Sequence, residues 1–138
     1  MNRNDLQLLT DARVEDAQVL MESKRWAAAY YLLGYAVECA PKACVAQRFR
    51  QDEIPEKALV NDFYSHKLDR LTLIAGLRPT LDARLGVDQA FSGNWNTVCL
   101  WSEASRYNHE TTEDQARNLL AAVVDSQVGV LPWLKTRW

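Results

Sequence analysis

The chain has 138 residues, of which 48% are hydrophobic and 25% charged, and its formal net charge is −2 at pH 7. This length is enough for one domain, residues 1–138, to bury about two-thirds of the surface that its unfolded chain exposes. The slight negative charge excludes a molecule-wide positive field, so any contact with nucleic acid must come from a local basic patch.

The cysteines and apolar runs are typical of a cytoplasmic protein. The cysteine count is odd and no signal peptide is recognisable, which favours reduced, mostly buried thiols. The longest apolar run, residues 26–37, is too short to span a bilayer, so we expect no membrane contact. The sequence has no Gly-rich phosphate loop, no Cys/His metal set and no Gly-x-Ser-x-Gly motif, and we expect neither metal nor cofactor.

The first helix is predicted over residues 5–23, with Asn4 as its capping residue. Arg13 falls in the middle of its apolar stripe, where a cation needs a partner or an opening. Arg13 therefore either pairs with an acid or points into a polar cleft. Asp16 is the nearest acid, one turn further on, and Glu38 of the following helix is the partner that we expect across the helix pair.

Residues 26–50 form the central helix of the predicted fold, and residues 26–37 within it are all apolar or small. A helix that is apolar on nearly every side must be covered by other helices. Pro41 lies deep inside the pattern, and we expect a kink rather than an end there because the apolar spacing resumes beyond it. Glu38 and Lys42, one turn apart, either form a surface ion pair or line a cleft.

The middle of the chain is predicted to contain a loop and two short helices. Residues 51–64 show no firm helical spacing and are read as a loop that holds at most one helical turn. A helix over residues 66–75 ends at Gly76, and a second short helix covers residues 79–85. His66 is interpreted as a surface histidine at a helix start.

The last third of the chain is predicted to hold two longer helices. The first covers residues 88–107 and would place Ser102, Arg106 and His109 on one face. The second begins at Thr111 or Thr112, and Thr112 with Gln115 resembles a capping box. No segment alternates apolar and polar residues as a strand does, so the predicted fold class is all-α, a helical bundle of about five helices.

The densest polar cluster is residues 102–110, SEASRYNHE. Arg106 can hold a phosphate through its planar guanidinium, and His109 can move a proton near neutral pH. Together the two side chains can cleave RNA by activating the 2′-hydroxyl, without a metal. Equally, the cluster can be a polar helix end in which Arg106 pairs with Glu103 or Glu110.

Several segments resemble one family. Residues 34–46, GYAVECAPKACVA, are similar to the signature of HEPN domains, which typically read like GYAVELALKA. The other matching segments, in the same order, are DARVEDAQVL at residues 11–20, FYSHKLDRL at residues 63–71, and Trp101, Arg106 and Tyr107. The resemblance covers nearly the whole chain and implies a HEPN-like α-helical bundle with a long central helix.

The resemblance also implies a function. HEPN domains usually dimerise, and many are metal-independent RNases of toxin–antitoxin, abortive-infection and CRISPR-linked systems. Others accompany a minimal nucleotidyltransferase encoded beside them. Arg106 and His109 best match the catalytic pair of the family, but fewer residues separate them than in the catalytic motif. We therefore expect a non-catalytic binding module, with a metal-independent endoribonuclease as the alternative.

Contacts to a nucleotide or RNA are expected from polar side chains beside the apolar stripes: Arg106, Tyr107, Asn108, Ser102, Arg13, Glu38 and Lys42. The expected partners are a second copy of the chain and a nucleotidyltransferase or an antitoxin. The homodimer is expected because one bundle of this size has too little surface to cover the central helix together with Trp26, Trp101, Trp133 and Trp138.

Overall fold

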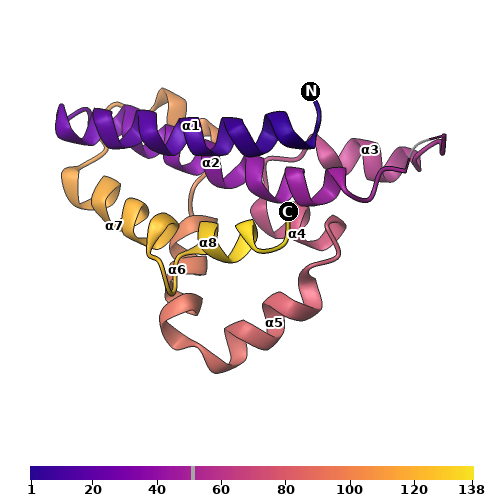
Figure 1. Ribbon diagram of the computed structural model, residues 1–138. Coiled ribbons are helices and arrows are strands. Elements are labelled where there is room, and N and C mark those ends of the chain that lie inside the picture. The colour runs from indigo at the N-terminus through magenta and orange to yellow at the C-terminus, as the bar shows by residue number, and fades with distance from the viewer. Residues whose placement is uncertain (51) are drawn as a thin grey trace.

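The computed structural model describes residues 1–50 and 52–138, and this part of the chain forms eight α-helices and one 3₁₀ helix, without a strand. In chain order they are α1 Arg3–Glu22, α2 Trp26–Ala46, α3 Lys57–Phe63, α4 Leu68–Ile74, α5 Arg78–Val87, α6 Gln89–Cys99, η1 Glu103–Tyr107, α7 Glu113–Val124 and α8 Val130–Lys135. The all-α class predicted from the sequence is confirmed, with more and shorter helices than the prediction held (Figure 1).

The central element is α2. It contacts α1, α4, η1, α7 and α8, and α1 lies antiparallel along it in Figure 1. Most of its residues are buried, as its nearly all-round apolar sequence requires. The helix continues through Pro41, as predicted, and ends at Ala46 rather than at residue 50.

Capping boxes set where two of the helices begin. At α1, the Asn2 side chain accepts a hydrogen bond from the Asp5 N–H at 3.0 Å, and the Asp5 carboxylate accepts one from the Asn2 N–H at 2.8 Å. This capping box starts the helix earlier than the predicted cap at Asn4. The predicted box at α7 is confirmed, because Thr112 and Gln115 exchange the equivalent pair of hydrogen bonds. Each cap stabilises its helix by about 1 kcal/mol.

Short helices fill the middle of the chain. The helix α3 lies where the sequence predicted a loop with at most one turn, and Gln51 of that predicted loop lies outside the described residues. The helix α4 is shorter than the predicted helix over residues 66–75, and Gly76 lies just beyond its C-cap with a φ of +75°, in the left-handed region that favours glycine. The helix α5 is longer than predicted, since it continues through Gly86.

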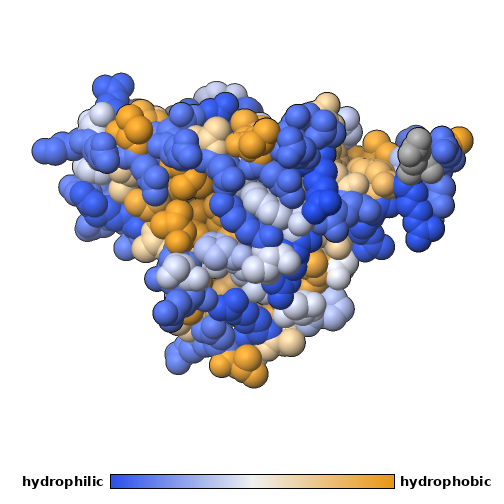
Figure 2. Space-filling model, viewed as in Figure 1, coloured by the Kyte–Doolittle hydropathy of each residue, from blue (hydrophilic) through white to orange (hydrophobic). Residues whose placement is uncertain are grey.

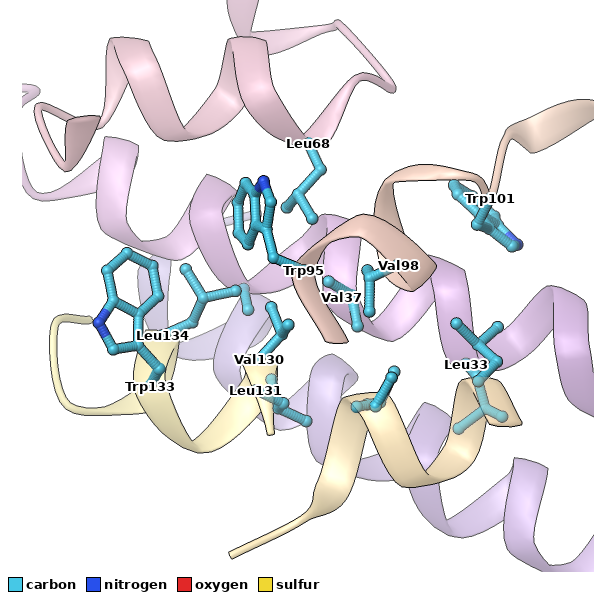
Figure 3. Packing of buried hydrophobic residues seen from close by; sticks show 14 of the residues in the cluster. Leu33, Val37, Leu68, Trp95, Val98, Trp101, Val130, Leu131, Trp133 and Leu134 are labelled. Atoms are coloured by element: carbon cyan, nitrogen blue, oxygen red, sulfur yellow. The ribbon is translucent and has the colours of Figure 1, made fainter. Parts of the chain in front are cut away.

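The main core cluster joins α2 to α6, α7 and α8 (Figure 3). Leu33 and Val37 of α2 are fully buried, and burying such a side chain stabilises the fold by about 1.5–3 kcal/mol. In α8, Trp133 and Leu134 are buried in the same cluster. Trp101 is buried as well, so one chain covers more of its tryptophans than the sequence suggested.

The prediction of one helix over residues 88–107 is wrong for the second half of that range. In the structure α6 ends at Cys99, Ser102 is extended with φ −142° and ψ 161°, and the 3₁₀ helix η1 follows. Trp101 leaves the helical path to pack on α2, and this tertiary contact overrides the local spacing. Ser102, Arg106 and His109 therefore do not share one helical face.

Candidate functional site

A cavity of about 710 Å³ opens between α2, α4 and α6. Its walls come from the middle of α2, from the turn before α4, from the first residue of α5, and from the end of α6 with the segment that follows. Val37, Leu68, Trp95 and Val98 contribute apolar wall, and Figure 3 shows Leu68 beside Trp95. The volume falls in the range of pockets that hold small molecules or cofactors.

Glu38 places a buried carboxylate in the wall of this cavity. The residue is 4% exposed. Its Oε1 accepts a hydrogen bond from Nζ of Lys42 at 2.6 Å, and its Oε2 lies 2.9 Å from Nδ1 of His66. An ionised carboxylate only accepts, so Nδ1 of His66 is the donor. Both carboxylate oxygens have partners, which offsets the cost of burying the charge.

This arrangement leaves an oriented imidazole at the cavity. The His66 side chain is 47% exposed and lines the cavity, whereas Lys42 does not line it. The Lys42 ammonium instead lies 5.7 Å from the centre of the Phe63 ring. With Nδ1–H on Glu38, Nε2 of His66 has no hydrogen-bond partner among the described residues, and it can accept a proton or a hydrogen bond, or donate one when the ring is protonated.

Trp101 forms part of the wall by packing directly on Gly34. A Cβ atom at Gly34 would lie 2.2 Å from three atoms of the Trp101 ring, so the close approach requires glycine. The Trp101 ring centre is also 6.2 Å from that of Tyr31. Because Trp101 begins the segment that leads to η1, this contact fixes where Ser102 and Glu103 meet the cavity.

Permanent charges of both signs line the cavity. Lys67 and Arg78 are the cations, and Asp69 and Glu103 join Glu38 as the acids. Arg78 Nε lies 3.0 Å from Asp82, while Lys67 has no ion-pair partner among the described residues. Acids outnumber permanent cations in this wall, but Lys67 and His66 place an ammonium and an oriented imidazole beside apolar and aromatic wall, where a ligand with a ring and an anionic group can bind.

The environments of the cysteines disfavour the reactive thiolate form. Cys99 lines the cavity, but desolvation raises the pKa of its thiol to about 11. Burial likewise raises the pKa values of Cys39 and Cys44 to about 11. Since the thiolate is the reactive form, these raised pKa values disfavour nucleophilic chemistry at the three thiols near neutral pH, although Cys99 is exposed.

The structure pairs Arg13 with Asp16 and not with Glu38. Arg13 and Asp16 form an ion pair on α1, which was one of the two predicted partners. The predicted pairing of Arg13 with Glu38 is wrong, because Lys42 and His66 occupy both oxygens of that carboxylate. Of the two readings of the Glu38–Lys42 pair, a cleft rather than the surface is confirmed for Glu38, which is buried and lines the cavity.

The other predicted site residues fall into those that line the cavity and those that do not, and Glu103 is the last residue of its wall in this segment. Ser102 lines the cavity together with Glu38, whereas the exposed side chains from Arg106 to His109 lie outside its wall. Arg106 lies 4.9 Å from the centre of the Tyr107 ring, and it has no ion pair with Glu103 or Glu110 among the described residues. Among the described residues, no hydrogen bond joins Arg106 to His109.

Sequence reasoning missed His66, Lys67 and Arg78. His66 was interpreted as a surface histidine, although it lies inside the FYSHKLDRL segment that carries the resemblance. The signal available was Glu38, a carboxylate on a mostly apolar helix that requires more than one hydrogen-bond donor. That requirement pointed to a donor elsewhere in the chain, and Arg13 was the wrong choice.

No protein-family model matches the chain, and no curated protein and no solved structure is similar enough to count as a match. Within the described residues, no helix combines the length and the apolar character needed to cross a membrane. In the same part of the chain, no three His, Cys, Asp or Glu side chains are grouped so that they could hold a metal ion.

Proposed function

We propose that the protein is a HEPN-like module that binds a nucleotide or RNA in the α2–α4–α6 cavity. In this proposal it acts without catalysis in a toxin–antitoxin or defence system, paired with a second copy and with a minimal nucleotidyltransferase or an antitoxin. The ligand places its base against the apolar wall and its phosphate at Lys67 and His66.

One observation carries the proposal. The segments with the family resemblance lie far apart in the sequence, yet three of them meet at one cavity. Residues 34–46 contribute Gly34 and Glu38, residues 63–71 contribute His66, and the last set contributes Trp101, whereas its Arg106 and Tyr107 lie outside the wall. A shared cavity explains why segments so far apart in the sequence would matter together. Its cations match the phosphate of a nucleotide, and its rings match the base.

The test is binding of ribonucleoside monophosphates and of a mixed-sequence single-stranded RNA, measured by titration calorimetry. Lys67→Ala removes a charged hydrogen-bond donor, and we expect it to weaken binding roughly tenfold. The control is Lys57→Ala, which removes an exposed lysine of α3 outside the cavity wall and should leave the affinity unchanged. Equal effects of the two substitutions, or no binding by the wild type, contradict the proposal.

The second candidate is a metal-independent endoribonuclease, and the pairing of Glu38 with His66 favours it. A buried carboxylate that holds Nδ1–H of an imidazole leaves Nε2 in position to take or give a proton. The test is RNA cleavage with EDTA present, comparing the wild type with His66→Ala, Arg106→Ala and His109→Ala. Loss of cleavage with His66→Ala alone assigns the reaction to the cavity. Loss with Arg106→Ala and His109→Ala assigns it to the predicted pair, and no cleavage by the wild type excludes this candidate.

The proposed homodimer rests on apolar side chains that one chain leaves exposed. Leu8 and Val19 of α1 are 61% and 62% exposed, and Leu100 and Tyr107 are 82% and 78% exposed. Figure 2 shows orange apolar atoms between α1 and α7 on a mainly blue face. Trp101 and Trp133 no longer support the dimer, because the chain buries both.

A further inference from the structure

A second, smaller hollow adjoins the cavity. It has a volume of about 570 Å³, and its wall is formed by Ser65, Lys67, Asp69, Arg70, Leu73 and Arg78. Four of these residues, Ser65, Lys67, Asp69 and Arg78, also line the cavity. A ligand seated in the cavity can therefore extend past these shared residues into the smaller hollow.

The smaller hollow differs from the cavity in its charge. Its cations are Lys67, Arg70 and Arg78, and its one acid is Asp69, whose Oδ1 accepts a hydrogen bond from the backbone N–H of Arg70 at 2.8 Å. Positive charge thus exceeds negative charge in this wall, whereas the cavity also contains Glu103 and the paired Glu38. The aromatic wall of the cavity does not continue into the hollow.

Arg70 is the cation that belongs to the smaller hollow alone. Its Nη2 is hydrogen-bonded to Asp62, and Nε and Nη1 have no hydrogen-bond partner among the described residues. A guanidinium carries five N–H donors, so Arg70 can keep Asp62 and still donate to an anion. Lys67 has no ion-pair partner among the described residues, and Arg70 and Arg78 keep further N–H donors beside Asp62 and Asp82. Without a ring-sized apolar wall, these donors suit a phosphate rather than a base.

We propose that the site takes a nucleotide with a second phosphoryl group, which lies in the smaller hollow on Lys67, Arg70 and Arg78. The inference rests on the proposed function, because the first phosphate and the base must occupy the cavity. The second phosphate has two sources with the same chemistry: the distal phosphate of a nucleoside diphosphate, or the next phosphate of an RNA strand. In both cases the residue that distinguishes the ligand from a monophosphate is Arg70.

The test compares three probes: a ribonucleoside monophosphate, the matching diphosphate, and a dinucleotide with a 5′-phosphate. We expect Arg70→Ala to weaken binding of the diphosphate, the dinucleotide or both by roughly tenfold, and to leave the monophosphate unchanged. Whichever probe is affected identifies the source of the second phosphate. Arg70→Lys retains the charge and should retain most of the affinity. The matched control, Arg117→Ala, removes another exposed, acid-paired arginine on α7, outside both hollows.

The outcomes separate the subsite from the cavity. An equal loss for all three probes, or no loss for any, overturns the second phosphate site while the cavity proposal stands. Failure of the wild type to bind the monophosphate contradicts the proposed function, and the subsite that rests on it. A loss with Arg117→Ala as large as with Arg70→Ala reveals a general charge effect and also overturns the assignment.

Discussion

Replacing Gly34 with alanine tests how α2 and Trp101 build the cavity wall. The added Cβ would lie 2.2 Å from three atoms of the Trp101 ring, where ordinary contacts begin near 3.4 Å. The ring would have to move by more than about 1 Å, and such overpacking costs about 1–3 kcal/mol. Displacing the ring also loses part of the about 3–5 kcal/mol that a buried tryptophan contributes.

The helix itself favours the substitution. Alanine is more stable than glycine in a helix interior by about 1 kcal/mol, which offsets part of the clash. We therefore expect Gly34→Ala to lower the free energy of unfolding by about 1–3 kcal/mol in urea titrations. Gly93→Ala on α6 is the matched control, because its Cβ meets no atom within 4 Å, and it should raise stability by up to about 1 kcal/mol.

The Trp101→Ala background isolates the clash. Without the ring, Gly34→Ala should change from destabilising to stabilising, because only the helix preference remains. The reasoning is refuted if Gly34→Ala alone is as stable as the wild type, or if its effect has the same sign and size with and without the Trp101 ring.

Three other predictions follow from the structure. Glu38→Ala with Lys42→Ala should show a coupling energy of about 1–3 kcal/mol in unfolding experiments, whereas Glu38→Ala with Arg13→Ala should be additive; the reverse result would restore the Arg13 pairing. The hydrogen bond from the Phe91 N–H lowers the pKa of the Asp88 carboxyl, so its contribution to stability is complete above about pH 4 and is lost as the pH falls through the lowered pKa. Asp88→Asn should therefore flatten the acid side of the stability–pH curve, and an unchanged curve would contradict this. Light scattering at micromolar concentration should give twice 15.8 kDa, and a monomer mass would contradict the homodimer.

Sequence patterns predicted the features that depend on residues close together in the chain. The apolar spacing of α2 located the central helix, and Thr112 with Gln115 located the start of α7, because capping and helix faces involve residues within a turn or two. The end of α6 was missed because it depends on Trp101 meeting Gly34, a contact between distant parts of the chain.

The site was predicted only in part for the same reason. Glu38 and Ser102 were identified, and both line the cavity. His66 was not, because its partner Glu38 lies on another helix and nothing in its own neighbours marks it. Arg106 and His109 stay predictions, to be decided by the RNA cleavage comparison.

The most direct test of the account is whether a nucleotide occupies the α2–α4–α6 cavity. The chain has five tryptophans, of which Trp95 and Trp101 line the cavity and Trp133 does not. In proton–nitrogen NMR spectra, a ribonucleoside monophosphate should shift the indole signals of Trp95 and Trp101 and leave that of Trp133 in place. Lys67→Ala should move the midpoint of the shift to roughly tenfold higher ligand concentration. Signals that do not respond, or that respond at Trp133 rather than at Trp95 and Trp101, would contradict the account.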